Sequence, residues 1–229
     1  MAKRSGWSDA GNLLQVTDAA SFASAFGVSR ESRIAFETYE QLLRRWQAVQ
    51  DLVAPSTVDA VWQRHFADSA QLLALSPDAK TWLDLGSGAG FPGLVIAILL
   101  RERPGARVHL VESNMRKCAF LADVARATDA PVEIHQNRLE SLIIPPEFRS
   151  FEVVTARALA PLGKLIGFAK PFFSAGTVGY FLKGRDAPLE VEAAMKVWRF
   201  TSTLIPSRTD GDARIVEVTK IEALKEGFP

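Results

Sequence analysis

The stretch from Trp82 to Gly93 constrains the fold of this chain more than any other. An apolar run ends there in an acidic residue, four glycines follow within eight positions, and a second apolar run spans Leu94 to Leu100. This pattern is typical of a buried strand that turns tightly into a buried helix. The glycines let the backbone approach a small ligand, and the helix N-terminus faces the same point. We therefore expect a ligand of nucleotide type at this turn, as in doubly wound α/β domains.

Strand-like and helical segments alternate from Lys80 onward, which predicts parallel βαβ units in a doubly wound sheet. The expected strands cover residues 81–85, 107–111, 132–135, 151–155 and 177–182. Helices are expected between them over residues 92–101, 114–128 and 162–172, and a final strand pair over 201–205 and 213–219 closes the sheet.

The part of the chain before Lys80 shows no strand pattern, so we expect a helical extension over residues 1–76 that packs on a core of residues 77–229. A loose tail runs to about Gly11, and a short helix runs from Asp18 to a stop at Gly27. A long amphipathic helix follows Ser29, and one further helical pattern runs from Thr57 to Leu73.

Composition limits the class of protein. Hydrophobic residues make up 48% and charged residues 23% of the chain, the balance of a soluble globular protein. No uncharged apolar run reaches the about 20 residues that cross a bilayer, and the N-terminus carries no secretory pattern, so we expect a cytoplasmic protein. The only cysteine, Cys118, rules out an intrachain disulfide. A net charge of +1 argues against a general nucleic-acid coat but leaves room for a local basic patch.

The glycine turn fits two ligand patterns. Residues 88–93 satisfy the dinucleotide fingerprint G-x-G-x-x-G. Residues 84–90 place an acid before G-x-G-x-G, which resembles the first motif of S-adenosylmethionine-dependent methyltransferases, and Asp84 would there bind a ligand ammonium or orient the turn. Glu112, at the end of the second strand, suits ribose hydroxyls in either case. A dehydrogenase would need a substrate domain after the sixth strand, whereas a minimal methyltransferase domain fits the length up to Pro229. We therefore favour methyl transfer over a small nicotinamide reductase, while a turn that only packs helix on strand stays an alternative.

Further motifs, over roughly residues 31–220, resemble one family: the bacterial small-subunit ribosomal RNA guanine-N7 methyltransferases, also called glucose-inhibited division protein B. Besides residues 83–93, the matching pieces are Arg64-His65-Phe66-Ala67-Asp68-Ser69, Glu112-Ser113 with Arg116-Lys117 and Phe120-Leu121, Asn137-Arg138-Leu139-Glu140, Ala156-Arg157-Ala158 and Leu182-Lys183-Gly184. The resemblance implies a Rossmann-like, class I S-adenosylmethionine-dependent methyltransferase sheet. It also implies S-adenosyl-L-methionine as the cofactor and small-subunit (16S) ribosomal RNA, or a ribosomal particle, as the partner.

The resemblance implies cofactor contacts by Gly86, Phe91, Leu139, Glu140 and Arg157. The residue patterns alone add Asp84, Gly88 and Glu112 to that set. Candidates for phosphate contact with the RNA are Arg116, Lys117, Arg138, Lys183 and Arg185.

The chemistry predicts a site without an acid–base pair. Guanine N7 already carries a lone pair in the ring plane, so the protein mainly has to position the base and the cofactor, and we assign no catalytic residue. His65 with Asp68 could contact a ligand or pin the helical extension to the sheet. His109 and His135 are expected to be structural, and the three histidines show no metal-ligand spacing, so we expect no metal. We also expect the protein to be a monomer. Open alternatives are a methyltransferase of this fold with another substrate, and a nucleotide-binding interaction module without turnover.

Overall fold

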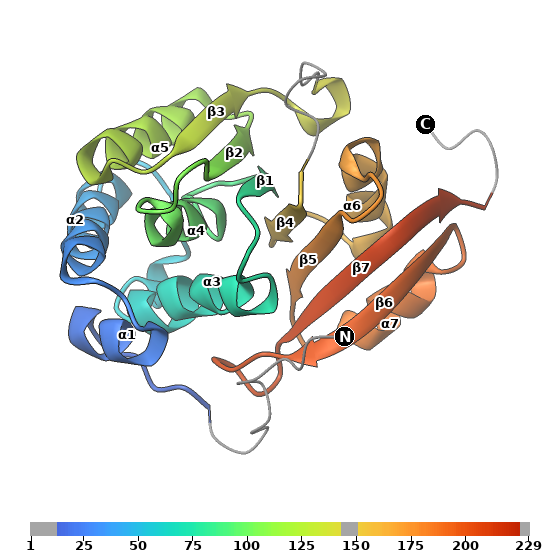
Figure 1. Cartoon of the computed structure of the whole chain (residues 1–229), viewed down its shortest axis with the longest axis horizontal. Helices are drawn as coiled ribbons and strands as arrows, with labels where there is room; N and C mark the ends of the chain where they lie inside the picture. Colours follow the sequence, from blue (N-terminus) through green and yellow to red (C-terminus); the bar gives the residue numbers. More distant parts are fainter. Residues whose placement is uncertain (1–12, 143–150, 225–229) are drawn as a thin grey trace.

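The structure is a computed structural model that describes residues 13–142 and 151–224; the predicted N-terminal tail lies outside these ranges. Within them, seven strands form one sheet in the order β3-β2-β1-β4-β5-β7-β6 (Figure 1). The strands are β1 (Thr81–Leu85), β2 (Arg107–Glu112), β3 (Val132–Gln136), β4 (Val153–Arg157), β5 (Val178–Lys183), β6 (Trp198–Pro206) and β7 (Arg214–Ala223). Strands β1 to β5 pair in parallel, and β7 runs antiparallel between β5 and β6. The predicted doubly wound sheet is confirmed.

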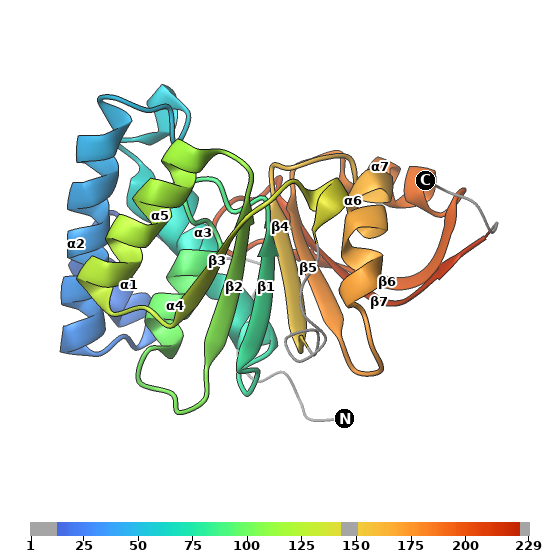
Figure 2. The ribbon, with the colours of Figure 1, turned by 90° about the horizontal axis from the view of Figure 1, so that it is seen from above.

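Helices cover both faces of this sheet (Figure 2). On one face, α4 (Gly93–Leu100) and α5 (Met115–Thr128) pack together with the N-terminal helices, and on the other lie α6 (Leu162–Ala169) and α7 (Ala187–Ala194). Side chains alternate along each strand, so that Trp82 faces the first layer whereas Leu83 and Leu85 face the second. Because helices cover both faces of the sheet, its central strands are buried on both sides and read as short apolar runs in the sequence.

Helix α7 was not predicted. Its buried residues, Ala187, Val191 and Ala194, have helical spacing, but two of the three are alanines and so give a weak apolar signal. The helix packs against α6 and closes the second layer.

The N-terminal segment is helical, as predicted. Helix α1 (Ala19–Phe26) begins at a capping box formed by Asp18 and Ser21 and ends at Gly27, whose φ of +62° suits glycine. Helix α2 (Arg30–Gln47) begins after Ser29, whose side chain accepts a hydrogen bond from the backbone N–H of Ser32.

The helical pattern expected from Thr57 to Leu73 is confirmed over most of its length, but it is not a regular α-helix. After the short turn η1 (Pro55–Thr57), one continuous helical stretch passes from a π-helical turn, η2 (Trp62–Ala67), through α3 (Asp68–Ala70) into the 3₁₀ turns of η3 (Gln71–Leu75). Polar side chains of this stretch hydrogen-bond to residues far away in sequence, among them Gln63 to Thr209 and Gln71 to Arg208. Single π turns of this kind are frequent at functional sites.

The N-terminal helices and the sheet share one hydrophobic core. The rings of Phe36 and Tyr39 in α2 pack on Phe66, and Tyr39 also lies parallel to Phe91 of the glycine turn at a centroid distance of 5.4 Å. These rings are fully buried or nearly so, which makes them the main apolar contribution at this contact. No helix among the described residues is long and apolar enough to span a membrane.

Candidate active site

Two adjoining cavities open where the parallel strands end. The first, here called the turn cavity, has a volume of about 490 Å³ and is bordered by the glycine turn, the end of β2 and residues 137–140. The second, the hairpin cavity, has a volume of about 760 Å³ and is bordered by residues 63–65, by Asp68 and by the β6–β7 connection. Both volumes lie in the range of small-molecule sites, and ligands of open α/β sheets gather at this edge.

The two cavities have a common wall. Leu52, Val53 and residues 157–160, which follow β4, border both of them. Within that wall Ala158 has a φ of +52°, a conformation that costs energy in a residue with a side chain. A group bound in one cavity would therefore face a group bound in the other across the end of β4.

The glycines of the turn serve different purposes. A Cβ at Gly93 would lie 2.3 Å from a Leu110 methyl and 2.8 Å from the Asp84 carboxylate, so this glycine permits close packing of helix on strand. At Gly88, which has a φ of +57°, a Cβ would have only the Gly86 carbonyl within 4 Å, at 3.9 Å. Gly88 therefore leaves open space at the turn cavity, as expected of a ligand cradle.

Asp84 lies beneath the turn and does not line either cavity. Its carboxylate, 1% exposed, accepts hydrogen bonds from the Gly93 N–H at 3.2 Å and from the Thr155 hydroxyl at 2.9 Å. Burial raises the pKa of Asp84 to about 6, although these hydrogen bonds act to lower it. Of the two roles considered for Asp84, the contacts favour orientation of the turn.

The other predicted cofactor residues border the turn cavity. They are Gly86, Gly88, Phe91, Glu112, Leu139, Glu140 and Arg157. Glu112 accepts hydrogen bonds from the Gly88 N–H at 3.0 Å and the Asn114 N–H at 2.7 Å, so its carboxylate stands at the end of β2 beside the turn. Residues 139–141 form a short 3₁₀ turn, η4 (Leu139–Ser141), that follows β3 along the same edge.

Arg157 is the centre of a cluster in the common wall. Its guanidinium lies 5.0 Å from the centroid of the Phe91 ring, and it donates to the Arg64 carbonyl at 3.0 Å and to His65 Nδ1 at 2.8 Å. Its Nη1 is also 3.5 Å from a carboxylate oxygen of Asp68. The Arg157 side chain is only 17% exposed, so these partners fix its orientation.

These contacts determine the protonation state of His65. A guanidinium can only donate, so His65 Nδ1 must accept and the ring proton must reside on Nε2. Nε2 then donates to the Thr57 hydroxyl at 2.8 Å, and Thr57 donates to the Ala54 carbonyl at 2.7 Å. Burial, with help from the charge of Arg157, lowers the pKa of His65 to about 3, so the ring is neutral. A directed chain of hydrogen bonds thus ties the 54–57 segment to Arg157.

Asp68 connects the same cluster to the β6–β7 connection. Its carboxylate accepts hydrogen bonds from the Thr209 hydroxyl and from the Gln71 amide, both at 3.0 Å. Burial raises the pKa of Asp68, and the nearby charge of Arg157 opposes this change. The structure therefore brings His65 and Asp68 into the candidate site, where both also pin the helical segment to the sheet.

The structure separates the basic residues proposed for phosphate contact. Lys117 and Arg138 border the turn cavity, and Arg116, in the same first turn of α5 as Lys117, is exposed. Lys183 is turned inward instead: its side chain is 10% exposed and donates to the Ala160 carbonyl at 2.6 Å and to Glu190 at 2.7 Å. Arg185 stays 79% exposed and pairs with Asp212.

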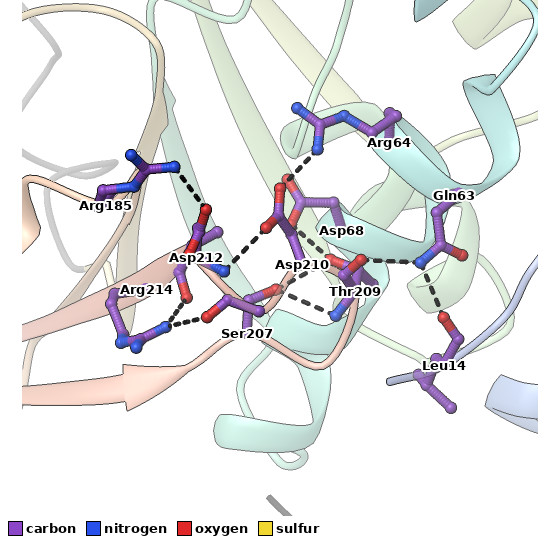
Figure 3. A network of polar contacts seen from close by, with 12 residues as sticks. Leu14, Gln63, Arg64, Asp68, Arg185, Ser207, Thr209, Asp210, Asp212 and Arg214 are labelled. Carbon is purple, nitrogen blue, oxygen red and sulfur yellow. Dashed lines mark hydrogen bonds and ion pairs between the residues drawn. The ribbon is translucent and has the colours of Figure 1, made fainter. Parts of the chain in front are cut away.

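Sequence reasoning missed the contribution of the β6–β7 connection, which Figure 3 shows in contact with the helical segment. Gln63 donates to the Thr209 carbonyl at 2.8 Å, Thr209 donates to Asp68, and Arg64 pairs with Asp210 at 2.6 Å. In the sequence, residues 207–213 look like an ordinary polar turn between two strands, so nothing local marks them as part of a site.

Two histidines come together elsewhere, on β2 and β3. His109 Nδ1 and His135 Nε2 are 2.8 Å apart, and carboxylate oxygens of Glu133 lie within 4.0 Å of both nitrogens. The expectation that the histidines show no metal-type grouping therefore needs correction, because strand pairing brings these three side chains to one face. The two rings are nearly coplanar, with 5.1 Å between centroids, so the facing nitrogens share one N–H···N bond rather than pointing at a common third position. The geometry favours the structural role expected for both.

Comparisons with known proteins agree with this architecture. The family model described as GidB, rRNA small subunit methyltransferase G, matches residues 33–212. Relatives named ribosomal RNA small subunit methyltransferase G include one from Methylorubrum populi, 54% identical over 85% of this chain and 91% of the relative. Another, from Caulobacter vibrioides, is 45% identical over 92% of this chain and 95% of the relative.

Solved structures share the fold at much lower identity. The O-methyltransferase TomG from Streptomyces achromogenes, solved in complex with SAM, superposes with a TM-score of 0.56 at 17% identity, covering 81% of this chain and 89% of that one. An O-methyltransferase from Bacillus cereus, solved in complex with SAH, superposes with a TM-score of 0.54 at 15% identity, covering 80% of this chain and 91% of that one. The sheet is thus the Rossmann-like sheet of S-adenosylmethionine-dependent methyltransferases, and the match over residues 33–212 assigns this chain to the GidB family, rRNA small subunit methyltransferase G.

Proposed function

We propose that this protein transfers the methyl group of S-adenosyl-L-methionine to N7 of one guanine in small-subunit ribosomal RNA. The observation that carries the proposal is the common wall at residues 157–160, which sets a cofactor-sized cavity beside a second cavity in a chain of the GidB family. Methyl transfer between two bound groups needs this adjacency, because the acceptor must reach the methyl group in line.

The turn cavity suits the cofactor in volume and in its lining groups. Open space at Gly88 accommodates a ligand close to the backbone, and the carboxylates of Glu112 and Glu140 suit ribose hydroxyls. Leu139 offers an apolar contact for a base, and the donors of Arg157 suit a carboxylate. Gly86 and Phe91 complete the cradle, and Asp84 holds the turn in shape from below. When bound there, the sulfonium supplies an activated methyl group.

The hairpin cavity would then receive the guanine. N7 lies on the major-groove edge of the base, and that groove is deep and narrow in paired RNA, so the base must be unpaired or flipped out. A cavity of about 760 Å³ next to the cofactor fits such a base better than a flat surface would. Because N7 already has a free lone pair, the residues of the wall need only hold the base and exclude water.

Attack by N7 needs no Lewis acid to create the nucleophile, so we infer an enzyme that acts without a metal. Because the proposed substrate is ribosomal RNA, we also infer that the enzyme acts in the cytoplasm, and we propose that it does so as a monomer. Arg116, Lys117, Arg138 and Arg185 remain candidates for phosphate contact, whereas the inward contacts of Lys183 favour support of the wall.

A methylation assay tests the proposal. Deproteinised small-subunit ribosomal RNA and intact small subunits, both from cells that lack this enzyme, are incubated with methyl-labelled S-adenosylmethionine, and the RNA is then digested to nucleosides. We expect label in 7-methylguanosine from at least one of the two substrates. Label in another nucleoside, or none, would contradict the assignment, as would tight binding of NADH without binding of S-adenosylmethionine in calorimetry.

A further inference from the structure

Two arginine–aspartate pairs stand at the mouth of the hairpin cavity (Figure 3). Arg64 comes from the helical segment and pairs with Asp210 at 2.6 Å, and Arg185, which follows β5, pairs with Asp212 at 2.8 Å. Both aspartates belong to the β6–β7 connection. Arg64 and Asp210 line the cavity directly, and Arg185 and Asp212 are chain neighbours of lining residues.

Both pairs are open to solvent. The side chains of Arg64 and Arg185 are 51% and 79% exposed, and exposed pairs of this kind contribute little to folding stability. Each pair uses one nitrogen of its guanidinium, while a guanidinium fork has five N–H donors suited to phosphate oxygens. The pairs therefore leave donors available at the entrance to the cavity.

The connection that carries the aspartates is held rigidly. Thr209 is bonded through its carbonyl to Gln63 and through its hydroxyl to Asp68, and the Arg208 N–H donates to the Gln71 side chain at 2.9 Å. The backbone N–H of Asp212 donates to the Asp210 carboxylate and lowers the pKa of Asp210. Asp210 is therefore ionised and fixed in position opposite Arg64, much as a bound phosphate oxygen would be.

We propose that Arg64 and Arg185 bind RNA phosphates next to the guanine that enters the hairpin cavity, and that Asp210 and Asp212 compete with those phosphates for the two guanidinium groups. This inference rests on the proposed function. It explains how a chain with a net charge of only +1 can bind a polyanion locally without attracting nucleic acid in general. An RNA gains both phosphate contacts only where it can place a base in the cavity and draw the two exposed guanidinium groups away from the aspartates.

The test measures the dissociation constant of the complex between this protein and deproteinised small-subunit ribosomal RNA over a range of salt concentrations. We expect Arg64→Ala and Arg185→Ala each to weaken binding and to reduce the slope of log affinity against log salt by about 0.7. Asp210→Asn should strengthen binding several-fold, because it removes the competitor. In the Arg64→Ala background Asp210→Asn should have no effect on binding, because the group competed for is gone.

A matched control separates local competition from a general change in charge. Arg199 and Glu222 form an exposed pair at 3.8 Å near the opposite end of the β6–β7 strand pair, away from the connection. Glu222→Gln changes the net charge as Asp210→Asn does, and it should leave RNA affinity unchanged. Equal gains from both variants, no gain from Asp210→Asn, or a gain that persists in Arg64→Ala would each overturn the inference.

The outcomes also separate this inference from the proposed function. Thermal melting and S-adenosylmethionine affinity should match the wild type in all these variants, which excludes misfolding. If the wild-type protein fails to form 7-methylguanosine in ribosomal RNA, the proposed function fails. If the wild type forms it while Asp210→Asn binds RNA no more tightly, only the competition is refuted.

Discussion

The two cavities differ in how the chain builds them. The turn cavity is bordered largely by short segments at the ends of β1, β2 and β3, the glycine turn among them. The hairpin cavity depends on side chains that meet from opposite ends of the chain, such as Asp68 with Thr209 and Arg64 with Asp210. Ligand binding in the turn cavity should therefore be sensitive to side chains that a substitution adds, and binding in the hairpin cavity to side chains that a substitution removes.

Arg157 belongs to both cavities, so its replacement should have the largest effect. Arg157→Lys keeps the charge but loses the fork that reaches His65 and the Arg64 carbonyl together. We expect kcat/KM for methylation to fall about 100-fold or more, since misplaced reacting groups cost that much. We also expect weaker binding of both S-adenosylmethionine and RNA. Arg199→Lys, at an exposed pair, is the control, and loss of only one of the two affinities would break the idea of a common wall.

A backbone site is best tested with a single methyl group. Gly88→Ala and Gly27→Ala place a side chain at similar left-handed φ angles without a steric clash, so both should cost roughly 1–2 kcal/mol of stability. Only Gly88→Ala should also weaken S-adenosylmethionine binding, about tenfold or about 1.4 kcal/mol, by calorimetry. Equal cofactor affinity in the two variants would show that Gly88 does not border the bound cofactor.

The hairpin cavity should respond to the opposite kind of change. Thr209→Val removes the hydroxyl that donates to Asp68 and should lower kcat/KM with RNA about fivefold, which corresponds to about 1 kcal/mol for one hydrogen bond. Cofactor affinity should stay at the wild-type value. Thr203→Val, on an exposed position of β6, serves as the control. A loss of cofactor affinity in Thr209→Val would show that the two cavities are less separate than the contacts indicate.

The smallest expected effect concerns the pH dependence of folding stability. The pKa of His65 is about 3 in the folded protein and about 6.5 when unfolded. The contribution of the neutral His65 ring to the free energy of unfolding is therefore fully present above pH 6.5 and is lost as the pH falls toward 3. Asp84, whose pKa is raised to about 6, acts in the opposite direction, since its contribution is lost as the pH rises through 6.

Urea unfolding between pH 4 and 6 measures whether His65 makes the free energy of unfolding rise with pH. His65→Gln should reduce the rise of the unfolding free energy with pH by up to about 1.4 kcal/mol per unit, because one proton fewer is taken up on unfolding. An unchanged slope would mean that His65 is charged in the fold, contrary to its bond from Arg157.

The difference between the cavities also explains what sequence reasoning achieved. The strands and the glycine turn were predicted within a few residues, because short apolar runs and glycine spacing are local signals. The basic candidates were less well resolved: Lys183 and Arg185 are two positions apart, yet one points inward and the other into solvent. That distinction depends on Glu190 and Asp212, which the fold alone brings near.

The departure of residues 62–75 from a regular α-helix was beyond prediction for the same reason. Their apolar residues have helical spacing, which indicates a helix but does not distinguish π, α and 3₁₀ turns. The π turn at residues 62–67 is stabilised by bonds from Gln63 and His65 to partners that lie elsewhere in the fold. The directed chain from Arg157 through His65 to Thr57 likewise appears only when three separate segments are placed together.

The hydroxyl of Tyr39 in α2 donates a hydrogen bond to the Ala89 carbonyl of the glycine turn, and its ring stacks on Phe91. Any local opening that lifts α2 from the sheet must therefore remove two contacts that support the turn, although none of the described residues of α2 lines the turn cavity. A ligand in that cavity binds only the closed form and so suppresses this opening. Amide hydrogen exchange along α2 should slow when the cofactor binds, which makes the helix a remote reporter of occupancy.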